Sequence, residues 1–225
     1  FRHVADSTQD YARYVSSTTH HLPRRGEPRV AALLAAGAGS RYIAAGGSTS
    51  HKLLAQVKGQ PLWHVALRAV ADADFDRVVV VTGSIDLELP PGTPPHVEVR
   101  HNPNWASGQA TSVQSAITVA AELGADSITI GLADQPGIPT VAWRAVADAD
   151  PGCRIVVARY DGRIGPNPVR LRSDVWPLLA TDGDEGARSL FRMHPEWVCH
   201  VDCAAPEDAA FDIDTPEDLQ RWNNC

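Results

Sequence analysis

A glycine-rich turn is the first stretch of this sequence that could do chemistry. An apolar run over residues 30–36 is followed directly by Gly37, Gly39, Ser40 and Arg41. Backbone N–H groups that no side chain shields can hold phosphate oxygens, and the arginine adds forked donors for the same oxygens. Lys52 could supply a second cation. The stretch predicts a phosphate site, although a plain tight turn between a strand and a helix fits its spacing equally well.

Two widespread phosphate-binding motifs do not match this turn. The P-loop needs a Lys followed by Ser or Thr after its last glycine, and no such pair is present. The dinucleotide fingerprint needs a third glycine at position 42, where this chain has Tyr42. The turn alone is therefore a weak signal for nucleotide binding.

Three carboxylates could hold a metal near that turn. Asp134 follows a predicted strand and could hold Mg²⁺ against bound phosphates. Asp212 and Asp214 flank Ile213 on a predicted extended segment, so their side chains share one face and could share a cation with Asp134. Turn-forming or solvated aspartates would have the same local sequence, and that alternative stays open.

The residues that follow this acidic pair have a structural explanation. Thr215 is typical of a helix N-cap, Pro216 of the first helical position, and Asp218 completes a capping-box variant. Glu217 and Asp218 are therefore given no chemical role.

Other polar segments could contact a ligand. Gly108 begins a hydroxyl-rich predicted helix containing Ser112, which could bind a base or ribose, although a plainly capped helix would look the same. Residues 165–168 are predicted as a polar turn. Residues 183–188 are predicted as another, opening a helix that could take an anion through Gly186 and Arg188. Taken singly, each is more often only a turn.

The elements that must position these residues alternate between strands and helices. This order predicts an α/β fold with a mostly parallel, Rossmann-like sheet in three layers. Ligands bind such sheets at the carboxyl ends of the strands, where Gly37, Gly83 and Asp134 are expected. Residues 42–50 are predicted as a mobile loop that could close over a ligand. Predicted strands are 30–36, 78–81, 97–99, 127–133 and 154–158, and predicted helices are 62–73, 108–121 and 139–147.

Composition bounds the class of protein. The chain has 225 residues, of which 44% are hydrophobic and 21% charged, as expected for a soluble globular domain. The net charge of −7, with scattered Lys and Arg, argues against a nucleic-acid partner. No apolar run reaches the length of a membrane span. We predict one domain over residues 29–225 after a flexible extension, residues 1–28, which lacks the apolar core of a signal peptide.

The cysteines are predicted to be unpaired. Cys153, Cys199, Cys203 and Cys225 form no C-x-x-C pair and do not resemble a disulfide framework. His200 between two of them permits a metal interpretation, but apolar fillers of a C-terminal strand are favoured. This usage predicts a reducing, cytoplasmic setting.

Taken together, the motifs resemble the MobA-like nucleotidyltransferase family, and most closely its molybdenum cofactor cytidylyltransferase branch. The resemblance covers residues 29–222, and its pieces occur in the family's order, which makes it specific. The matching pieces are residues 34–41 with Lys52, then 59–62, 108–112, 132–136, 167–169, 183–188 and 212–219.

The resemblance implies a reaction in which a substrate phosphate attacks the α-phosphate of a nucleoside triphosphate and expels pyrophosphate. Its catalytic residues would be Arg41, Lys52 and Asp134, with Mg²⁺ held by Asp134, Asp212 and Asp214. The nucleotide would contact Leu34, Ala35, Ala36, Gly37, Gly39, Ser40, Arg41, Lys52, Thr82, Gly108, Ser112 and Asp134. The acceptor would contact Gln135, Asn167, Gly183, Gly186 and Arg188.

The same resemblance favours particular substrates. Ala36 stands where guanylyl members have Gly, which favours CTP, with molybdopterin as acceptor and a molybdoenzyme or its chaperone as recipient. Ten residues separate Arg41 from Lys52, more than is usual, and Asn167 stands where the branch generally has His. Alternatives are a guanylyltransferase acting on a small phosphorylated acid, as in deazaflavin-cofactor synthesis, and a non-catalytic nucleotide-binding chaperone. A Rossmann oxidoreductase is disfavoured by Tyr42.

Overall fold

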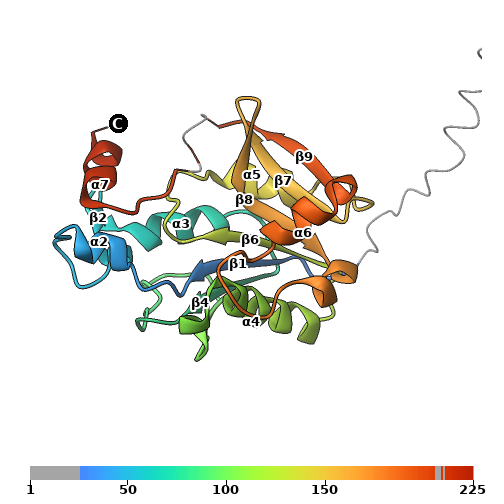
Figure 1. Ribbon diagram of the computed structural model, residues 1–225, viewed down its shortest axis with the longest axis horizontal. Helices are drawn as coiled ribbons and strands as arrows, with labels where there is room; N and C mark the ends of the chain where they lie inside the picture. Colours follow the sequence, from blue (N-terminus) through green and yellow to red (C-terminus); the bar gives the residue numbers. More distant parts are fainter. Residues whose placement is uncertain (1–25, 206–208, 210, 225) are drawn as a thin grey trace, which may run out of the picture.

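The computed structural model describes residues 26–205, 209 and 211–224, built on one seven-stranded sheet (Figure 1). The strand order is β5-β4-β1-β6-β8-β7-β9, and β8 is antiparallel to both neighbours while the other pairs are parallel. This confirms the predicted mostly parallel α/β fold. The strands are β1 Val30–Ala35, β4 Arg77–Thr82, β5 Val97–His101, β6 Ser127–Leu132, β7 Ile155–Tyr160, β8 Arg163–Arg172 and β9 Val198–Cys203.

Helices cover both faces of this sheet, as Figure 1 shows for α3 and α4 on either side of β1. Along β1, Leu33 packs with α3 and α5, whereas Leu34 packs with α4, because successive side chains point to opposite faces. The strand is buried along its whole length. The helices are α2 Ser40–Ala44, α3 Leu62–Ala71, α4 Gln109–Glu122, α5 Thr140–Ala147, α6 Arg188–Met193 and α7 Pro216–Asn223.

Short elements complete the chain. Strands β2, Gln56–Val57, and β3, Gln60–Pro61, form a small antiparallel ladder beside α7. In the described ranges, 3₁₀ segments occupy Lys52–Leu54, Trp105–Ser107, Ser173–Leu178 and Pro195–Trp197. The predicted capping box at the start of α7 is confirmed: Thr215 and Asp218 satisfy each other's backbone N–H groups. Within the described residues, no helix is long and apolar enough to cross a membrane.

The prediction of a turn over residues 165–168 is wrong, because these residues belong to β8. Asp161 and Gly162 both have positive φ, 46° and 78°, as in the tight turns that join antiparallel strands, and they connect β7 to β8. The prolines that suggested a turn coincide with a register shift between the two strands, where a missing N–H is tolerated. The peptide bond between Asn167 and Pro168 is cis.

Part of the predicted loop over residues 42–50 is helical. Helix α2 includes Tyr42, whose side chain is buried. A Cβ atom at Gly47 would lie 2.0 Å from the Tyr42 ring, so the chain after the helix folds back on that ring. The small residues of this segment thus permit close packing, which the sequence did not distinguish from mobility.

The cysteine prediction is also wrong, since Cys153 and Cys199 form a disulfide. The two residues are 46 positions apart but lie at the starts of β7 and β9, which are parallel neighbours in the sheet. Cys203 is a buried free thiol. The prediction of a reducing setting rested on unpaired cysteines, and this disulfide removes that support. Cys225 and most of the predicted extension, residues 1–25, lie outside the described residues.

A buried arginine fastens α5 to β8. The Arg170 side chain donates hydrogen bonds to the carbonyl oxygens of Ala147, Ala149 and Asp150, at 3.0, 2.7 and 2.6 Å. These carbonyls lie at the end of α5, where the helix leaves acceptors without partners and favours a cation. Burial lowers the pKa of Arg170 from its usual value. The three bonds offset the cost of burying the charge.

We expect Arg170→Met to lower the free energy of unfolding by about 2–4 kcal/mol, because three carbonyl groups lose the buried guanidinium that donates to them. Urea unfolding followed by circular dichroism measures the change. Arg192→Met is the control, since Arg192 is exposed and pairs with an exposed Glu185. Equal midpoints for the Arg170 and Arg192 variants would show that the buried guanidinium does not stabilise the domain.

Candidate functional site

Three segments that are remote in sequence meet at the carboxyl edge of the sheet. The Lys52 ammonium lies 2.7 Å from Asp134 Oδ2 and 2.6 Å from Asp214 Oδ1. Arg41 Nη1 lies 2.6 Å from the other oxygen of Asp214. The structure thus joins both predicted cations to two of the predicted carboxylates, close to the glycine turn.

Backbone packing brings these carboxylates together. Asp134 lies two residues past the end of β6, and its carbonyl oxygen accepts a hydrogen bond from the Ile213 N–H. The Ile213 side chain is fully buried, so the residues on either side, Asp212 and Asp214, point away from the core toward the site. In Figure 1 the end of β1, α2 and α7 gather on this side of the molecule.

The cluster is strongly coupled electrostatically. Burial by itself lowers the pKa of Lys52, whose side chain is only 11% exposed, but the charges and hydrogen bonds of Asp134 and Asp214 raise it overall. Burial likewise raises the pKa of Asp214, but the hydrogen bond and charge of Lys52, followed by Arg41, lower it overall. Both partners are therefore charged across the neutral pH range.

Asp212 lies in a different environment. Burial raises its pKa, and the negative charge of Asp134 raises it further. Its Oδ1 accepts a hydrogen bond from Gln135 Nε2 at 2.8 Å, and Gln135 Oε1 accepts one from Asn167 Nδ2 at 2.8 Å. Gln135 is 1% and Asn167 9% exposed. These two predicted acceptor residues thus form a buried chain that holds Asp212, rather than an open surface.

One carboxylate oxygen fits a cation. Asp134 Oδ1 is buried and has no hydrogen-bond partner among the described residues. Such an atom is costly unless something positive approaches it, and a hard divalent cation prefers carboxylate oxygens. However, the described part of the chain contains no group of three or more His, Cys, Asp or Glu side chains placed to hold a metal. The predicted triad of Asp134, Asp212 and Asp214 is not assembled, because Lys52 occupies the contact between two of its members.

The glycine turn and Lys52 are in close contact. Gly39 has a φ of 64°, and a Cβ atom there would lie 3.2 Å from Lys52 Cγ. Only glycine combines this conformation with this approach without strain. The side chains of Leu34, Ala35 and Ala36 are buried in the core. These predicted nucleotide-binding residues can therefore offer only backbone atoms to a ligand.

Ser112 and Thr82 are likewise turned inward. Ser112 is 3% exposed, and its hydroxyl accepts a hydrogen bond from Asn102 Nδ2 at 3.0 Å. Asn102 also donates its backbone N–H to the Thr82 carbonyl oxygen. Sequence reasoning missed Asn102, which joins β4 to α4. Its signal is the Asn-Pro pair directly after β5, which is typical of a turn and does not by itself indicate a binding residue.

The predicted nucleotide and acceptor segments meet at the start of α4. Gly183 donates its N–H to Ser107 O at 2.8 Å and accepts from Ala110 N at 2.9 Å. A Cβ atom on Gly108 would lie 2.4 Å from the Gly183 backbone, so position 108 requires glycine. Gly186 packs near α4, whereas Arg188 is exposed at the first residue of α6.

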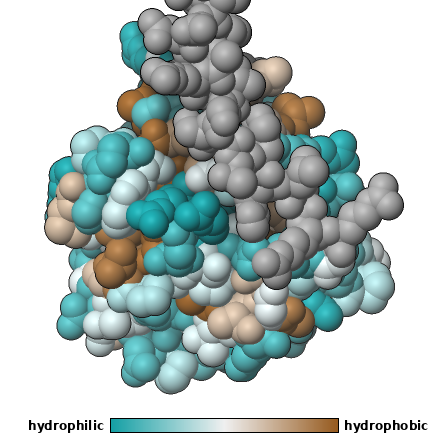
Figure 2. Space-filling view, turned by 90° about the vertical axis from the view of Figure 1, so that its right-hand side faces the viewer, coloured by the Kyte–Doolittle hydropathy of each residue, from teal (hydrophilic) through white to brown (hydrophobic). Residues whose placement is uncertain are grey.

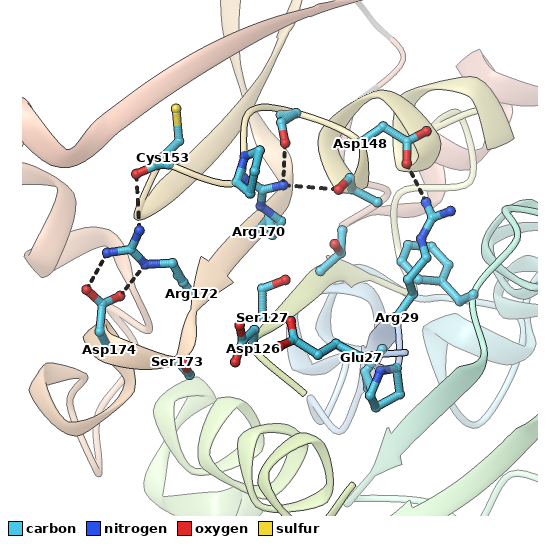
Figure 3. A pocket seen from close by; sticks show the side chains of 18 residues that line it. Glu27, Arg29, Asp126, Ser127, Asp148, Cys153, Arg170, Arg172, Ser173 and Asp174 are labelled. Atoms are coloured by element: carbon cyan, nitrogen blue, oxygen red, sulfur yellow. Dashed lines mark hydrogen bonds and ion pairs between the residues drawn. The ribbon is translucent and has the colours of Figure 1, made fainter. Parts of the chain in front are cut away.

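A cavity of about 830 Å³ lies at the opposite edge of the sheet, beside the start of β1 (Figure 3). Several of its charged side chains already have partners: Arg172 binds Asp174, and Arg29 binds Asp148. Figure 2 shows hydrophilic and hydrophobic side chains interspersed over the visible part of one side of the molecule. The clustered cations and carboxylates, and not this cavity, mark the candidate site.

Comparisons with known proteins show which family and which relatives the chain is similar to. The model of the MobA-like NTP transferase domain matches residues 31–198. The purine catabolism protein PucB of Bacillus subtilis is 29% identical over 189 residues, covering 79% of this chain and 91% of that protein.

Solved structures show the same fold. A nucleotidyl transferase from Methanothermobacter superposes with a TM-score of 0.71 at 22% identity, covering 88% of this chain and 97% of that one. A Mycobacterium tuberculosis protein in complex with manganese superposes with a TM-score of 0.65 at 24% identity, covering 88% of this chain and 99% of that one.

The paired charges predict a pH-dependent stability. The pKa of Asp214 lies below its usual 3.8, so its pairing stabilises the fold above that pH and is lost as the pH falls through the lowered pKa. The pKa of Lys52 lies above 10.5, so its pairing is lost only as the pH rises beyond that value. We expect Lys52→Met to cost about 1–3 kcal/mol near pH 7, because two carboxylates lose their cation.

Urea unfolding from pH 7 to pH 3 measures this cost, which should shrink as the pH falls below 3.8 and the Asp214 carboxylate becomes protonated. Lys58→Met is a matched control, since Lys58 is the chain's other lysine and is exposed. A cost that is constant over this range would contradict the ion-pair explanation.

Proposed function

The chain belongs to the MobA-like NTP transferase family, and from this premise we propose that it is a cytidylyltransferase that transfers CMP from CTP to molybdopterin. In this reaction an oxygen of the acceptor phosphate bonds to the α-phosphorus of CTP. The bond from that phosphorus to the oxygen bridging the α- and β-phosphates breaks, and pyrophosphate leaves with the electron pair. No covalent enzyme intermediate is needed, so positioning and charge neutralisation carry the catalysis.

The observation that carries this proposal is the Lys52 ammonium held between Asp134 and Asp214 beside the glycine turn. Lys52 can exchange a carboxylate contact for a triphosphate oxygen without leaving its place. The Arg41 side chain is 79% exposed and is free to swing from Asp214 to the same anion. Two cations at one end of the sheet suit the charge that develops on the leaving pyrophosphate.

The carboxylates fit a divalent cation, which we propose to be Mg²⁺. Asp134 would hold it through its unpartnered Oδ1, together with Asp214 or Asp212. When bound, the cation neutralises triphosphate charge. Nucleotidyltransferases of this fold use divalent metals, and a mycobacterial protein of the same fold was solved in complex with manganese. The protein's own part is to orient Asp134 through β6 and Asp212 through the buried Gln135 and Asn167 chain.

Support for CTP and molybdopterin comes from the resemblance to the molybdenum cofactor branch. Ala36, which stands where guanylyl members have glycine, supports CTP. We place the base and ribose near Gly108 and the acceptor on the side of Asn167 and Gly183. The likeness to a purine catabolism protein leads us to propose that the product serves purine breakdown, through a molybdoenzyme or its chaperone.

We expect pyrophosphate release to require CTP, Mg²⁺ and molybdopterin together, measured with each of the four nucleoside triphosphates and with each acceptor. Activity only with GTP and a small phosphorylated acid would replace this proposal with the guanylyltransferase alternative. Nucleotide binding without turnover for any acceptor would favour the chaperone alternative.

Asp134→Asn should reduce turnover by about 10²–10³-fold, because the site loses a metal-facing charge at the reacting phosphate. CTP binding in the absence of metal should survive, as measured by calorimetry. Asp126→Asn is the control, since Asp126 is exposed at the opposite edge of the sheet. Unchanged turnover in Asp134→Asn would remove Asp134 from the mechanism.

A further inference from the structure

A buried histidine beside Lys52 has no role in the chemistry proposed above. The His51 side chain is 2% exposed. Its Nε2 lies 2.8 Å from the Gly37 carbonyl oxygen, and its Nδ1 accepts a hydrogen bond from the Leu53 N–H at 3.2 Å. One imidazole ring therefore contacts the glycine turn with one nitrogen and the chain just after Lys52 with the other.

These two contacts determine the ring's protonation. The Leu53 N–H can only donate, so Nδ1 must carry a lone pair. The Gly37 carbonyl can only accept, so Nε2 must carry the proton. Both conditions hold together only for a neutral ring protonated at Nε2. An imidazolium would place an N–H against the Leu53 N–H and break that contact.

The surroundings keep the ring neutral. Burial is the largest cause that lowers the pKa of His51 below 6.5, and the charge of Lys52 lowers it further, while the bond to Gly37 opposes both. The other polar group that faces the ring is the Ser84 hydroxyl, 3.1 Å from Nε2, which donates to the same Gly37 carbonyl at 2.8 Å. The ring and this hydroxyl thus hold one carbonyl oxygen from two sides.

We propose that His51 is a positioning residue for nucleotide binding, whose neutral ring sets the place of Lys52 relative to the glycine turn. This inference rests on the proposed function, since it takes the turn and Lys52 as the triphosphate site. Lys52 lies between the two residues that the ring engages on its own segment, His51 itself and Leu53. The ring therefore sets the direction in which the lysine side chain leaves the backbone.

The position of Lys52 is coupled to the position of the glycine turn. The turn and Lys52 are already in contact at Gly39, so a shift of either one moves the other. With the Gly37 carbonyl held by the ring, the next backbone N–H groups, at residues 38–40, have no partner among the described residues and remain available for phosphate oxygens. Loss of the ring leaves the Gly37 carbonyl held by the Ser84 hydroxyl alone, so it can rotate more easily toward a bound anion, which it would repel.

The first test reads the ring directly and does not depend on activity. Nitrogen-15 NMR of the imidazole should show His51 as the neutral Nε2–H form at pH 7, with protonation only below pH 6.5. An Nδ1–H form, or an imidazolium at pH 7, would overturn the inference.

The second test separates the two contacts by substitution. The Asn side chain of His51→Asn can still accept a hydrogen bond from the Leu53 N–H but is too short to reach the Gly37 carbonyl. We therefore expect the Kd and KM for CTP with Mg²⁺ to rise on the order of tenfold, whereas kcat should change less. His51→Gln places an amide N–H near the former Nε2 and should restore binding to within about threefold. His64→Gln is the control, since His64 is a partly buried histidine on α3, away from the turn.

The outcomes distinguish this inference from the proposed function. Wild-type protein that binds no nucleoside triphosphate would overturn the proposed function and the inference with it. Two results would overturn the inference alone. One is a His51→Asn variant that binds CTP as tightly as the wild type does. The other is an equal loss of CTP affinity in the Asn and Gln variants. Urea midpoints show whether each variant is folded under the assay conditions.

Discussion

The buried ammonium of Lys52 is the constraint on which the candidate site depends. A lysine that is only 11% exposed is costly unless its charge is paired. Its two partners, Asp134 and Asp214, stand 82 and 162 positions further along the chain. Pairing the charge therefore requires β6, the segment before α7 and the turn after β1 to be in place together. The same contact that helps to close the fold also assembles the charged cluster.

This pairing explains how the charged cluster around Lys52 can be stable without a ligand and still accept a highly charged one. The Lys52 ammonium is already paired with carboxylates. An incoming phosphate would take the place of one of them, so the ammonium would stay paired with a negative group. The carboxylates outnumber the cations, and Asp134 keeps one oxygen unpartnered within the described part of the chain. A triphosphate alone would add repulsion, whereas a triphosphate with a divalent cation would not.

The sequence predicted the elements whose signals are local or continuous. Strands β1 and β4 are buried on both faces and therefore appear as unbroken apolar runs. The start of α7 follows from its capping box alone. Strand β8 and the Cys153–Cys199 disulfide were missed because both depend on tertiary pairing. A hairpin inserts the proline-containing strand between β6 and β7, and sheet order makes neighbours of the two cysteines.

The same distinction applies within the site. Charged residues could be placed from the sequence, because parallel strands bring their carboxyl ends to one edge. The orientation of uncharged polar residues could not, and Ser112 and Gln135 turn inward to join buried networks. With those side chains engaged by the protein itself, few groups remain to contact a ligand besides backbone atoms and the charged cluster. Under the proposed placement of the base and ribose near Gly108, backbone shape would help to choose the nucleotide, because Gly108 and Gly183 meet closely enough to exclude any side chain at position 108.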